Sequence, residues 1–277
     1  MIRIEKLGFS YGQVPVLKNI TMNLEPGKIY GLLGENGVGK TTLLTLLAGL
    51  KKPLQGSIDI DGSAPYSRTP QVLENQFYLA DEMLPVPMKA AEYARITGEF
   101  WPNYKQDTFE QIMELFENTS DKKMNEMSTG QLKKTYISLA LALGCKYLFL
   151  DEPTNGLDIP SKAQFRSALM KYTDEDSTIV ISTHQVRDLE NIIDPIIILD
   201  RQDVLLNASL EEISRKLYFD YGSQLHPESL YSEQLPGGFI QVYPNAEGAD
   251  SKVNIEALFN AVHHNKEFIK GLFAETL

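Results

Sequence analysis

Gly34-Glu35-Asn36-Gly37-Val38-Gly39-Lys40-Thr41-Thr42 is a glycine-rich run that fits the pattern Gly-x-x-x-x-Gly-Lys-Thr. An apolar segment precedes it over 29–33 and an apolar segment with helical spacing follows over 43–48, which predicts a strand, a loop and a helix. Glycines in such a loop let backbone N–H groups converge on one anion, and the helix N-terminus adds the positive end of its dipole. We expect Lys40 to reach the β- and γ-phosphates of a nucleoside triphosphate and the Thr41 hydroxyl to ligate Mg²⁺. A glycine-rich turn before a buried helix is the alternative, but Gly-Lys-Thr rarely falls at such a junction by chance.

Length and composition place the chain among ordinary globular proteins. Its 277 residues, 43% of them hydrophobic, suffice for an α/β core and a small accessory domain. The net charge of −11 repels a polyphosphate backbone, so no nucleic-acid partner is expected. Cys145 is the only cysteine, which excludes an internal disulfide and fits a reduced compartment. No apolar stretch reaches membrane-spanning length and no signal peptide is evident, so any membrane association is expected to come through a partner.

Alternation and helical spacing divide the chain into predicted elements. Residues 2–11 and 16–24 alternate, which predicts two antiparallel strands before the phosphate strand. Further strands are predicted at 57–62, 77–80, 147–150, 178–182 and 196–199. Helices are predicted at 88–100, 105–116, 129–143 and 161–172. The fold class is therefore α/β: a P-loop NTPase core with a mixed or parallel sheet, an antiparallel β subdomain and a helical insertion.

Two carboxylates, Asp151 and Glu152, directly follow the apolar strand 147–150. Open α/β sheets build their ligand sites at the carboxyl ends of the strands. Asp151 is expected to hold Mg²⁺ through water, and Glu152 to orient and polarise the water that attacks the γ-phosphate. A solvated strand end is the alternative, and the phosphate loop elsewhere in the chain favours the catalytic interpretation.

Three further motifs carry a family resemblance. Met127-Ser128-Thr129-Gly130-Gln131 is similar to the signature Leu-Ser-Gly-Gly-Gln, and 151–158 is similar to a Walker B segment that runs into a D-loop. Ser182-Thr183-His184 lies where a switch histidine belongs. In order and spacing, most of residues 1–215 resemble the nucleotide-binding (ATPase) subunit of an ATP-binding cassette (ABC) transporter, and the Ser-Thr-Gly signature is closer to exporter-like members.

The resemblance assigns roles to single residues. It implies that Glu152 and His184 are catalytic, and that His184 contacts the γ-phosphate and helps to order the attacking water. Tyr11 resembles the aromatic residue that stacks on adenine, although Phe9 shares its strand parity and one of the two can simply belong to the core. Asp158 joins the nucleotide-binding residues, together with those of the phosphate loop and the signature.

Ser128 and Gln131 also fit a Ser-x-x-Gln capping box, which would start the helix 129–143 without any ligand. In the family both interpretations hold together, because this helix N-terminus points at the γ-phosphate bound by the opposite subunit. Thr129 departs from the usual glycine. Since a β-branched residue resists positive φ, we expect a negative φ at this position.

The clearest departure from the family pattern follows the strand 77–80. Asp81 stands where the family usually has a glutamine, and Gln76 precedes the strand and is misplaced for that role. An Asp carboxylate is able to ligate Mg²⁺ or the attacking water, but it brings charge and lacks an amide donor. We count Asp81 as a metal ligand with Thr41 and Asp151, and a plain loop acid is the alternative.

The chain beyond the cassette is predicted to form a small α+β extension. We assign residues 1–215 to the ABC ATPase domain, with a helical subdomain at about 84–145, and residues 216–277 to the extension. A capped helix start is predicted at 209–212, just before this boundary, and the predicted elements of the extension are strands at 216–221 and 237–243 and an amphipathic helix over 255–272. His263 and His264 are adjacent and face different sides of that helix, so no metal site is expected there.

By resemblance, the chain is an ATPase subunit at the cytoplasmic face of the membrane, where it powers transport of an unknown substrate through separate transmembrane permease subunits. One phosphate loop per chain implies a homodimer, or a heterodimer with a related ATPase, that encloses ATP and Mg²⁺ between the phosphate loop of one subunit and the signature of the other. The alternatives are a soluble ABC ATPase that acts on nucleic acid or the ribosome, and a module that binds ATP without useful hydrolysis. The chain lacks the long coiled coils or second cassette typical of the former, and Glu152 and His184 argue against the latter.

Overall fold

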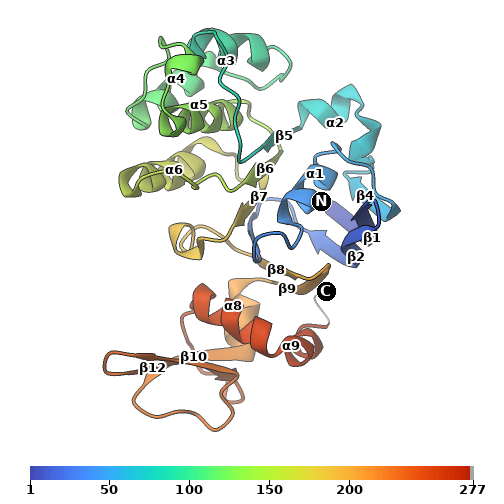
Figure 1. Ribbon diagram of the computed structural model, residues 1–277, viewed down its shortest axis with the longest axis vertical. Helices are drawn as coiled ribbons and strands as arrows, with labels where there is room; N and C mark the ends of the chain where they lie inside the picture. Colours follow the sequence, from blue (N-terminus) through green and yellow to red (C-terminus); the bar gives the residue numbers. More distant parts are fainter. Residues whose placement is uncertain (275–277) are drawn as a thin grey trace.

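The computed structural model describes residues 1–274, and within them three sheets form the framework of the molecule (Figure 1). The central sheet has the strand order β5-β6-β7-β3-β8-β9. Its strands are β3 (Ile29–Leu33), β5 (Gln76–Leu79), β6 (Tyr147–Asp151), β7 (Thr178–Thr183), β8 (Ile196–Asp200) and β9 (Asp203–Ala208). All neighbours are parallel except β8 and β9, which form an antiparallel hairpin. The predicted parallel core is therefore confirmed, and the edge strand β9 adds to it.

The predicted antiparallel subdomain is also confirmed. Its strands are β1 (Ile2–Tyr11), β2 (Val14–Leu24) and β4 (Gln55–Ile60), in the order β2-β1-β4. Inward residues of β1, such as Ile2 and Ile4, belong to the same buried cluster as the apolar face of α1 (Lys40–Leu47). This packing fixes the helix that follows the phosphate loop.

The predicted helical insertion forms a lobe of three helices, α3 (Ala90–Gly98), α4 (Gln106–Leu115) and α5 (Thr129–Ala142) (Figure 1). Each of them lies within its predicted range. Phe109 and Ile112 are fully buried, because the apolar face of α4 packs on α5. A further short helix, α2 (Pro70–Glu74), is absent from the sequence prediction, since five residues are too few to show a helical period.

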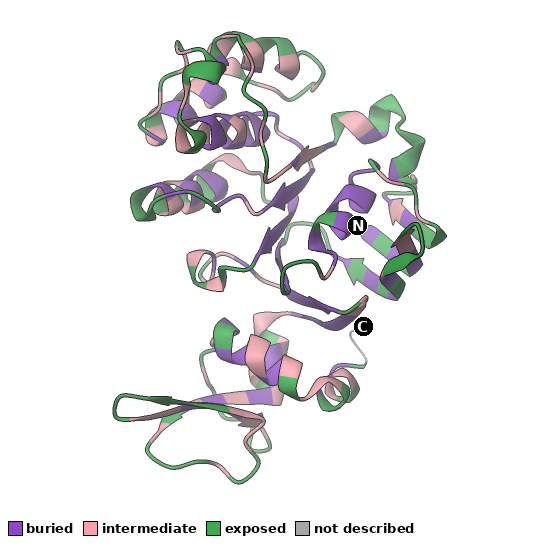
Figure 2. Ribbon diagram, in the orientation of Figure 1, coloured by how far each residue is buried: buried purple, intermediate pink, exposed green. Residues whose placement is uncertain are grey.

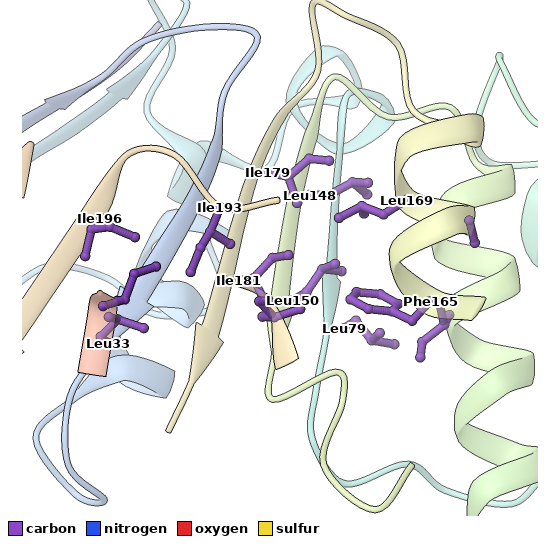
Figure 3. Close-up of a cluster of buried hydrophobic side chains, with 14 of the residues drawn as sticks. Leu33, Leu79, Leu148, Leu150, Phe165, Leu169, Ile179, Ile181, Ile193 and Ile196 are labelled. Carbon is purple, nitrogen blue, oxygen red and sulfur yellow. The ribbon is translucent and has the colours of Figure 1, made fainter. Parts of the chain in front are cut away.

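The central sheet is buried on both faces, which Figure 2 shows along the strands. Leu148 and Leu150 of β6 point toward α6 (Ile159–Tyr172), where Phe165 meets them (Figure 3). Phe149, which points to the opposite face, belongs to the cluster around α1. Because successive side chains alternate between the faces, a strand covered on both sides needs an uninterrupted apolar run. Each of these buried side chains contributes about 1.5 to 3 kcal/mol relative to an exposed one.

The extension has the predicted α+β character and lies at the opposite end of the molecule from the helical lobe (Figure 1). α7 (Leu210–Lys216) leads into it, and its own elements within the described residues are β10 (Leu217–Gly222), β11 (Tyr231–Leu235), β12 (Gly238–Pro244), α8 (Ile255–His264) and α9 (Lys266–Leu272). The prediction of one helix over 255–272 is wrong, because the chain breaks at Asn265. The Asn265 side chain donates to the carbonyl oxygens of Leu230 at 2.6 Å and Ala261 at 3.1 Å. Residues 275–277 of the predicted extension lie outside the described part.

Charged contacts join the extension to the central sheet. Lys266 and Lys270 of α9 pair with Asp200 and Asp203, which flank the turn between β8 and β9. α8 packs against the short helix η3 (Val186–Asp188) that follows β7. Within residues 1–274, none of the helices is long and apolar enough to cross a membrane.

Candidate functional site

The phosphate loop connects β3 to α1, as predicted, and its glycines adopt conformations that other residues resist. Gly37 has φ of 84° and Gly39, the N-cap of α1, has φ of 114°. A Cβ at Gly34 would lie 2.6 Å from the carbonyl oxygen of Leu199, so the loop is able to pack against β8 only with glycine there. The loop therefore presents backbone N–H groups at a helix N-terminus, which is an anion-binding arrangement.

Lys40 is buried at the start of α1 and points back into this loop. Its Nζ donates to the carbonyl oxygens of Gly34 at 2.8 Å and Glu35 at 3.2 Å, and lies 3.7 Å from Glu152 Oε1. Burial lowers the pKa of Lys40, and the charges of Glu152 and Asp151 oppose that shift. The ammonium is thus held at the mouth of the loop, where a phosphate chain would replace these weaker partners.

Asp151 ends β6 and is buried beneath the loop. Its carboxylate accepts from Ser182 Oγ at 2.5 Å and from the Tyr78 hydroxyl at 3.2 Å. Burial and the neighbouring Asp151 charge raise the pKa of Tyr78, so this phenol stays protonated and donates. Ser182 and Tyr78 are site residues that the sequence analysis missed. Only their position could have identified them, since both lie on strands that pair with β6 in the parallel sheet.

Glu152 follows with φ of 46°, a left-handed conformation that is uncommon for a residue with a Cβ. Its carboxylate Oε2 lies 2.9 Å from His184 Nδ1, so the two predicted catalytic side chains form a pair. The Glu152 N–H is held by Ser182, through the hydroxyl at 3.0 Å and the main-chain oxygen at 3.2 Å. A carboxylate held beside an imidazole at the phosphate loop has the chemistry of an acceptor for a proton from water.

Many of the predicted residues line one pocket of about 400 Å³ beside the phosphate loop. These are Tyr11, Asn36, Gly37, Gly39, Lys40, Thr41, Thr42, Asp81, Asp151 and Glu152. Gly34, Glu35 and His184 line an adjacent cavity between the loop and α8, and Val38 packs on the buried cluster around α1. The structure thus gathers the phosphate-loop and acidic residues in one region.

Tyr11 stands at the rim of the pocket, where the residue is 49% exposed and its hydroxyl lies 3.4 Å from Thr42 Oγ1. Phe9 packs against the buried cluster and meets the Tyr11 ring edge-on at 5.1 Å. Strand parity alone did not distinguish Phe9 from Tyr11, but their surroundings in the structure do. Phe9 is the core residue and Tyr11 is the accessible one.

Asp81 faces the same pocket, whereas Gln76 is buried away from it and donates to the Ala48 carbonyl. The Asp81 carboxylate accepts from Lys133 Nζ at 2.8 Å, and Asn155 Nδ2 lies 3.3 Å from both of its oxygens. Lys133 is another residue that the sequence analysis did not single out. Asp81 is accordingly an ion-paired carboxylate at the pocket wall.

The signature residues form the predicted capping box at the start of α5. Ser128 Oγ accepts from the Gln131 N–H at 3.3 Å, and Gln131 Oε1 accepts from the Ser128 N–H at 3.1 Å. Thr129 is the first helical residue and has a negative φ, as expected. Asp158 caps α6 through a bond from the Ser161 N–H at 2.9 Å. Gly130 and these capping residues line neither the pocket at the phosphate loop nor the adjacent cavity.

The oxygen donors at the phosphate loop suit a divalent cation with a nucleotide. Thr41, Asp81 and Asp151 supply hydroxyl and carboxylate oxygens, which are the ligands that Mg²⁺ prefers. No cluster of three His, Cys, Asp or Glu side chains that could hold a metal alone occurs in residues 1–274. The donor set therefore fits an ion that shares its coordination with phosphate oxygens and water.

Comparison with known proteins shows the family of the chain. The family described as ABC transporter matches residues 17–155. An uncharacterized ABC transporter ATP-binding protein of Methanocaldococcus jannaschii is 29% identical over 84% of this chain and 88% of its own length. A second uncharacterized protein of that description, from Bacillus subtilis, is 31% identical over 76% of this chain and 70% of its own length.

Solved structures show the same fold. A bacterial ABC transporter cassette, solved as a dimer and also as a dimer bound to ADP and Pi, superimposes with a TM-score of 0.67. It is 22% identical, and the match covers 76% of this chain and 99% of that one. The phosphate loop, the acidic pair and the signature thus lie on the fold expected for them, and the chain belongs to the ABC transporter family as an ATP-binding and ATP-hydrolysing subunit.

Proposed function

We propose that two copies of this chain close head to tail around two ATP molecules, and that hydrolysis reopens the pair. The observation that carries the proposal is the division of the site within one chain. Tyr11 and the phosphate loop line the pocket, whereas Ser128 and Thr129 are exposed at the start of α5 and line no part of it. Each chain has both halves, so two identical copies would complete two sites.

Within each site, this chain's own residues bind the nucleotide and move one proton. The phosphate-loop N–H groups and Lys40 would bind the β- and γ-phosphates, and Tyr11 would stack on the base. Glu152, paired with His184, would accept a proton from the attacking water, a role that contributes about 10² to 10⁴ in rate. The exposed N-terminus of α5 in the partner would face the γ-phosphate.

Mg²⁺ would be held by Thr41, Asp151 and Asp81. When bound, the ion neutralises charge on the phosphates. Asp151 is buried and already fixed by Ser182, which favours it as an anchor for the hydrated ion. Removal of Mg²⁺ by a chelator is expected to abolish turnover.

A groove of about 610 Å³ between the central sheet and the helical lobe would receive a cytoplasmic segment of a transmembrane permease. Leu50, Ile96 and Phe100 line it, and they are 50%, 39% and 72% exposed. Apolar side chains gathered in a groove between two lobes favour an amphipathic partner helix. In this arrangement residues 1–215 carry the ATPase at the cytoplasmic face, and residues 216–277 form an accessory extension.

Glu152→Gln tests the dimer and the catalytic role together. The amide keeps the shape of the side chain but accepts no proton, so the variant should bind ATP, lose most of its turnover and accumulate as a dimer with ATP and Mg²⁺. Light scattering after gel filtration would measure the mass. Glu114→Gln, on the exposed face of α4, is the matched control. A Glu152→Gln protein with undiminished hydrolysis would remove this residue from the base role.

Phe100→Asp tests the permease groove. The charge should prevent burial of the groove against an apolar partner, so the variant should lose the integral membrane protein that co-purifies with the wild-type chain from native membranes, while its own ATPase rate is kept. Met170→Asp makes the same change at an exposed apolar residue of α6. Equal recovery of the membrane protein with both variants would exclude the groove as the docking site.

A further inference from the structure

Lys133 lies on α5, two residues beyond the signature, and its buried ammonium reaches the edge of the nucleotide pocket. The side chain is 6% exposed. Its Nζ donates to Asp81 Oδ1 at 2.8 Å and to the main-chain oxygen of Glu152 at 2.8 Å. Because a buried ammonium must be paired and hydrogen-bonded, these acceptors fix where the group lies.

The contact with Glu152 matters because that residue has an unfavourable backbone conformation, with φ of 46°. Such a conformation persists only when the surroundings hold it. Ser182 accepts the Glu152 N–H on one side of the residue. On the other side, the Glu152 carbonyl accepts from Lys133 and, at 3.1 Å, from the Asn155 N–H. With the backbone in this left-handed conformation, the Glu152 carboxylate points to His184.

Asp81 completes the arrangement as the counter-ion of Lys133. Asn155 Nδ2 braces its carboxylate at 3.3 Å, and the ion pair spans the helical lobe and the loop after β5. A neutral glutamine at position 81 would leave the ammonium without an opposite charge in a buried place. The negative charge of Asp81 therefore balances the buried positive charge of Lys133.

We propose that Lys133 is a positioning residue for hydrolysis, which holds the Glu152 main chain so that its carboxylate stays beside His184. Asp81 keeps the ammonium in place. Lys133 is not among the residues that line the nucleotide pocket, so it acts through Glu152 and touches no substrate. The inference rests on the proposed role of Glu152 as the base.

Lys133→Met keeps the length of the side chain and removes the ammonium. We expect kcat to fall by about 10²-fold with the KM for ATP unchanged, because a displaced base slows the chemical step and leaves nucleotide binding intact. Lys134→Met is the matched control, since Lys134 is the next residue on α5 and donates to the Phe116 carbonyl, away from the pocket. An unchanged kcat in Lys133→Met would overturn the proposal.

A double-mutant cycle separates positioning from a general defect. In the Glu152→Gln background the base is already absent, so Lys133→Met should cause no further loss of the residual rate. Multiplied losses would show that Lys133 acts independently of Glu152, which contradicts the proposal. A Glu152→Gln protein with full activity would refute the proposed base role of Glu152, on which this inference rests, whereas an inactive one beside a fully active Lys133→Met would refute only the present inference.

The nucleotide-free protein offers a readout that does not depend on turnover. The chain has four histidines, so it gives few histidine ring-proton NMR signals. The signal that is missing from the spectrum of His184→Gln is that of His184. Lys133→Met should move the His184 ring signal toward its position in Glu152→Gln, and Lys134→Met should not. If Lys133→Met does not fold, Lys133→Gln replaces it in both experiments. Glutamine is polar but too short to reach both acceptors, so kcat and the His184 ring signal should change in the same direction as in Lys133→Met. A His184 signal that stays at the wild-type position would overturn the proposal.

Discussion

At the scale of single residues, Asp151 and Glu152 are neighbours in the chain but receive different surroundings. Asp151 continues β6 and is buried against Ser182, whereas the left-handed turn at Glu152 directs its carboxylate toward His184. The sequence predicts both acids, because they follow an apolar strand. It does not predict Ser182 or Lys133 as their partners, since these residues come from distant segments that only the folded sheet and helical lobe bring together.

Tyr11→Ala is expected to weaken ATP binding by about 1 to 3 kcal/mol, the range found when an aromatic platform for a base is removed. The maximal rate at saturating ATP should stay close to that of the wild type, because the proposed role of the ring is to bind the base and not to take part in the chemical step. Titration with a fluorescent ATP analogue would measure the affinity. Tyr66→Ala is the control, since Tyr66 has a similar exposure of 47% and does not line the pocket. Equal affinities of the two variants would show that Tyr11 does not stack on the base.

At the scale of elements, the regular segments with a clear period are predictable and the short or polar ones are not. The strands of the central sheet except β9, and the helices α3 to α6, appear where alternation and helical spacing place them. α2 is too short to show a period, and β11, with the sequence Tyr231-Ser232-Glu233-Gln234-Leu235, is largely exposed. The break at Asn265 depends on a bond to Leu230, which no local pattern reveals.

The signature helix allows its two roles to be separated. Ser128→Ala removes the N-cap of α5, and Ser209→Ala removes the equivalent N-cap of α7, where the Ser209 hydroxyl accepts from the Glu212 N–H. Each change should lower the free energy of unfolding by about 1 kcal/mol. Only Ser128→Ala should also lower the ATPase rate, because only that residue is proposed to face a phosphate of the partner. Thermal unfolding would measure the change in stability, and phosphate release would measure the ATPase rate. Equal ATPase rates in the two variants would show that Ser128 only caps α5 and has no role in hydrolysis.

At the scale of the whole molecule, the helical lobe and the extension lie at opposite ends of the central sheet (Figure 1). The sequence predicts the order of these parts along the chain, because the motifs have a fixed spacing, but not their placement at opposite ends. The contact between the extension and the central sheet depends on ion pairs such as Lys266 with Asp200. The partners are remote in the chain, so no sequence pattern predicts the pair. The separation of the signature from the nucleotide pocket is likewise a property of the whole molecule, since Ser128 and Thr129 line no part of that pocket.

Complementation between two inactive variants tests whether the site is shared by two chains. Lys40→Ala disables the phosphate loop. Gly130→Asp disables the signature with little strain within the chain, because a Cβ at Gly130 meets no atom within 4 Å and an acidic residue suits a helix N-terminus. Each variant alone should be inactive. An equimolar mixture should recover about a quarter of the wild-type ATPase rate, because half of the randomly formed dimers contain one intact site. A mixture as inactive as its separate components would contradict a site built from two copies of this chain.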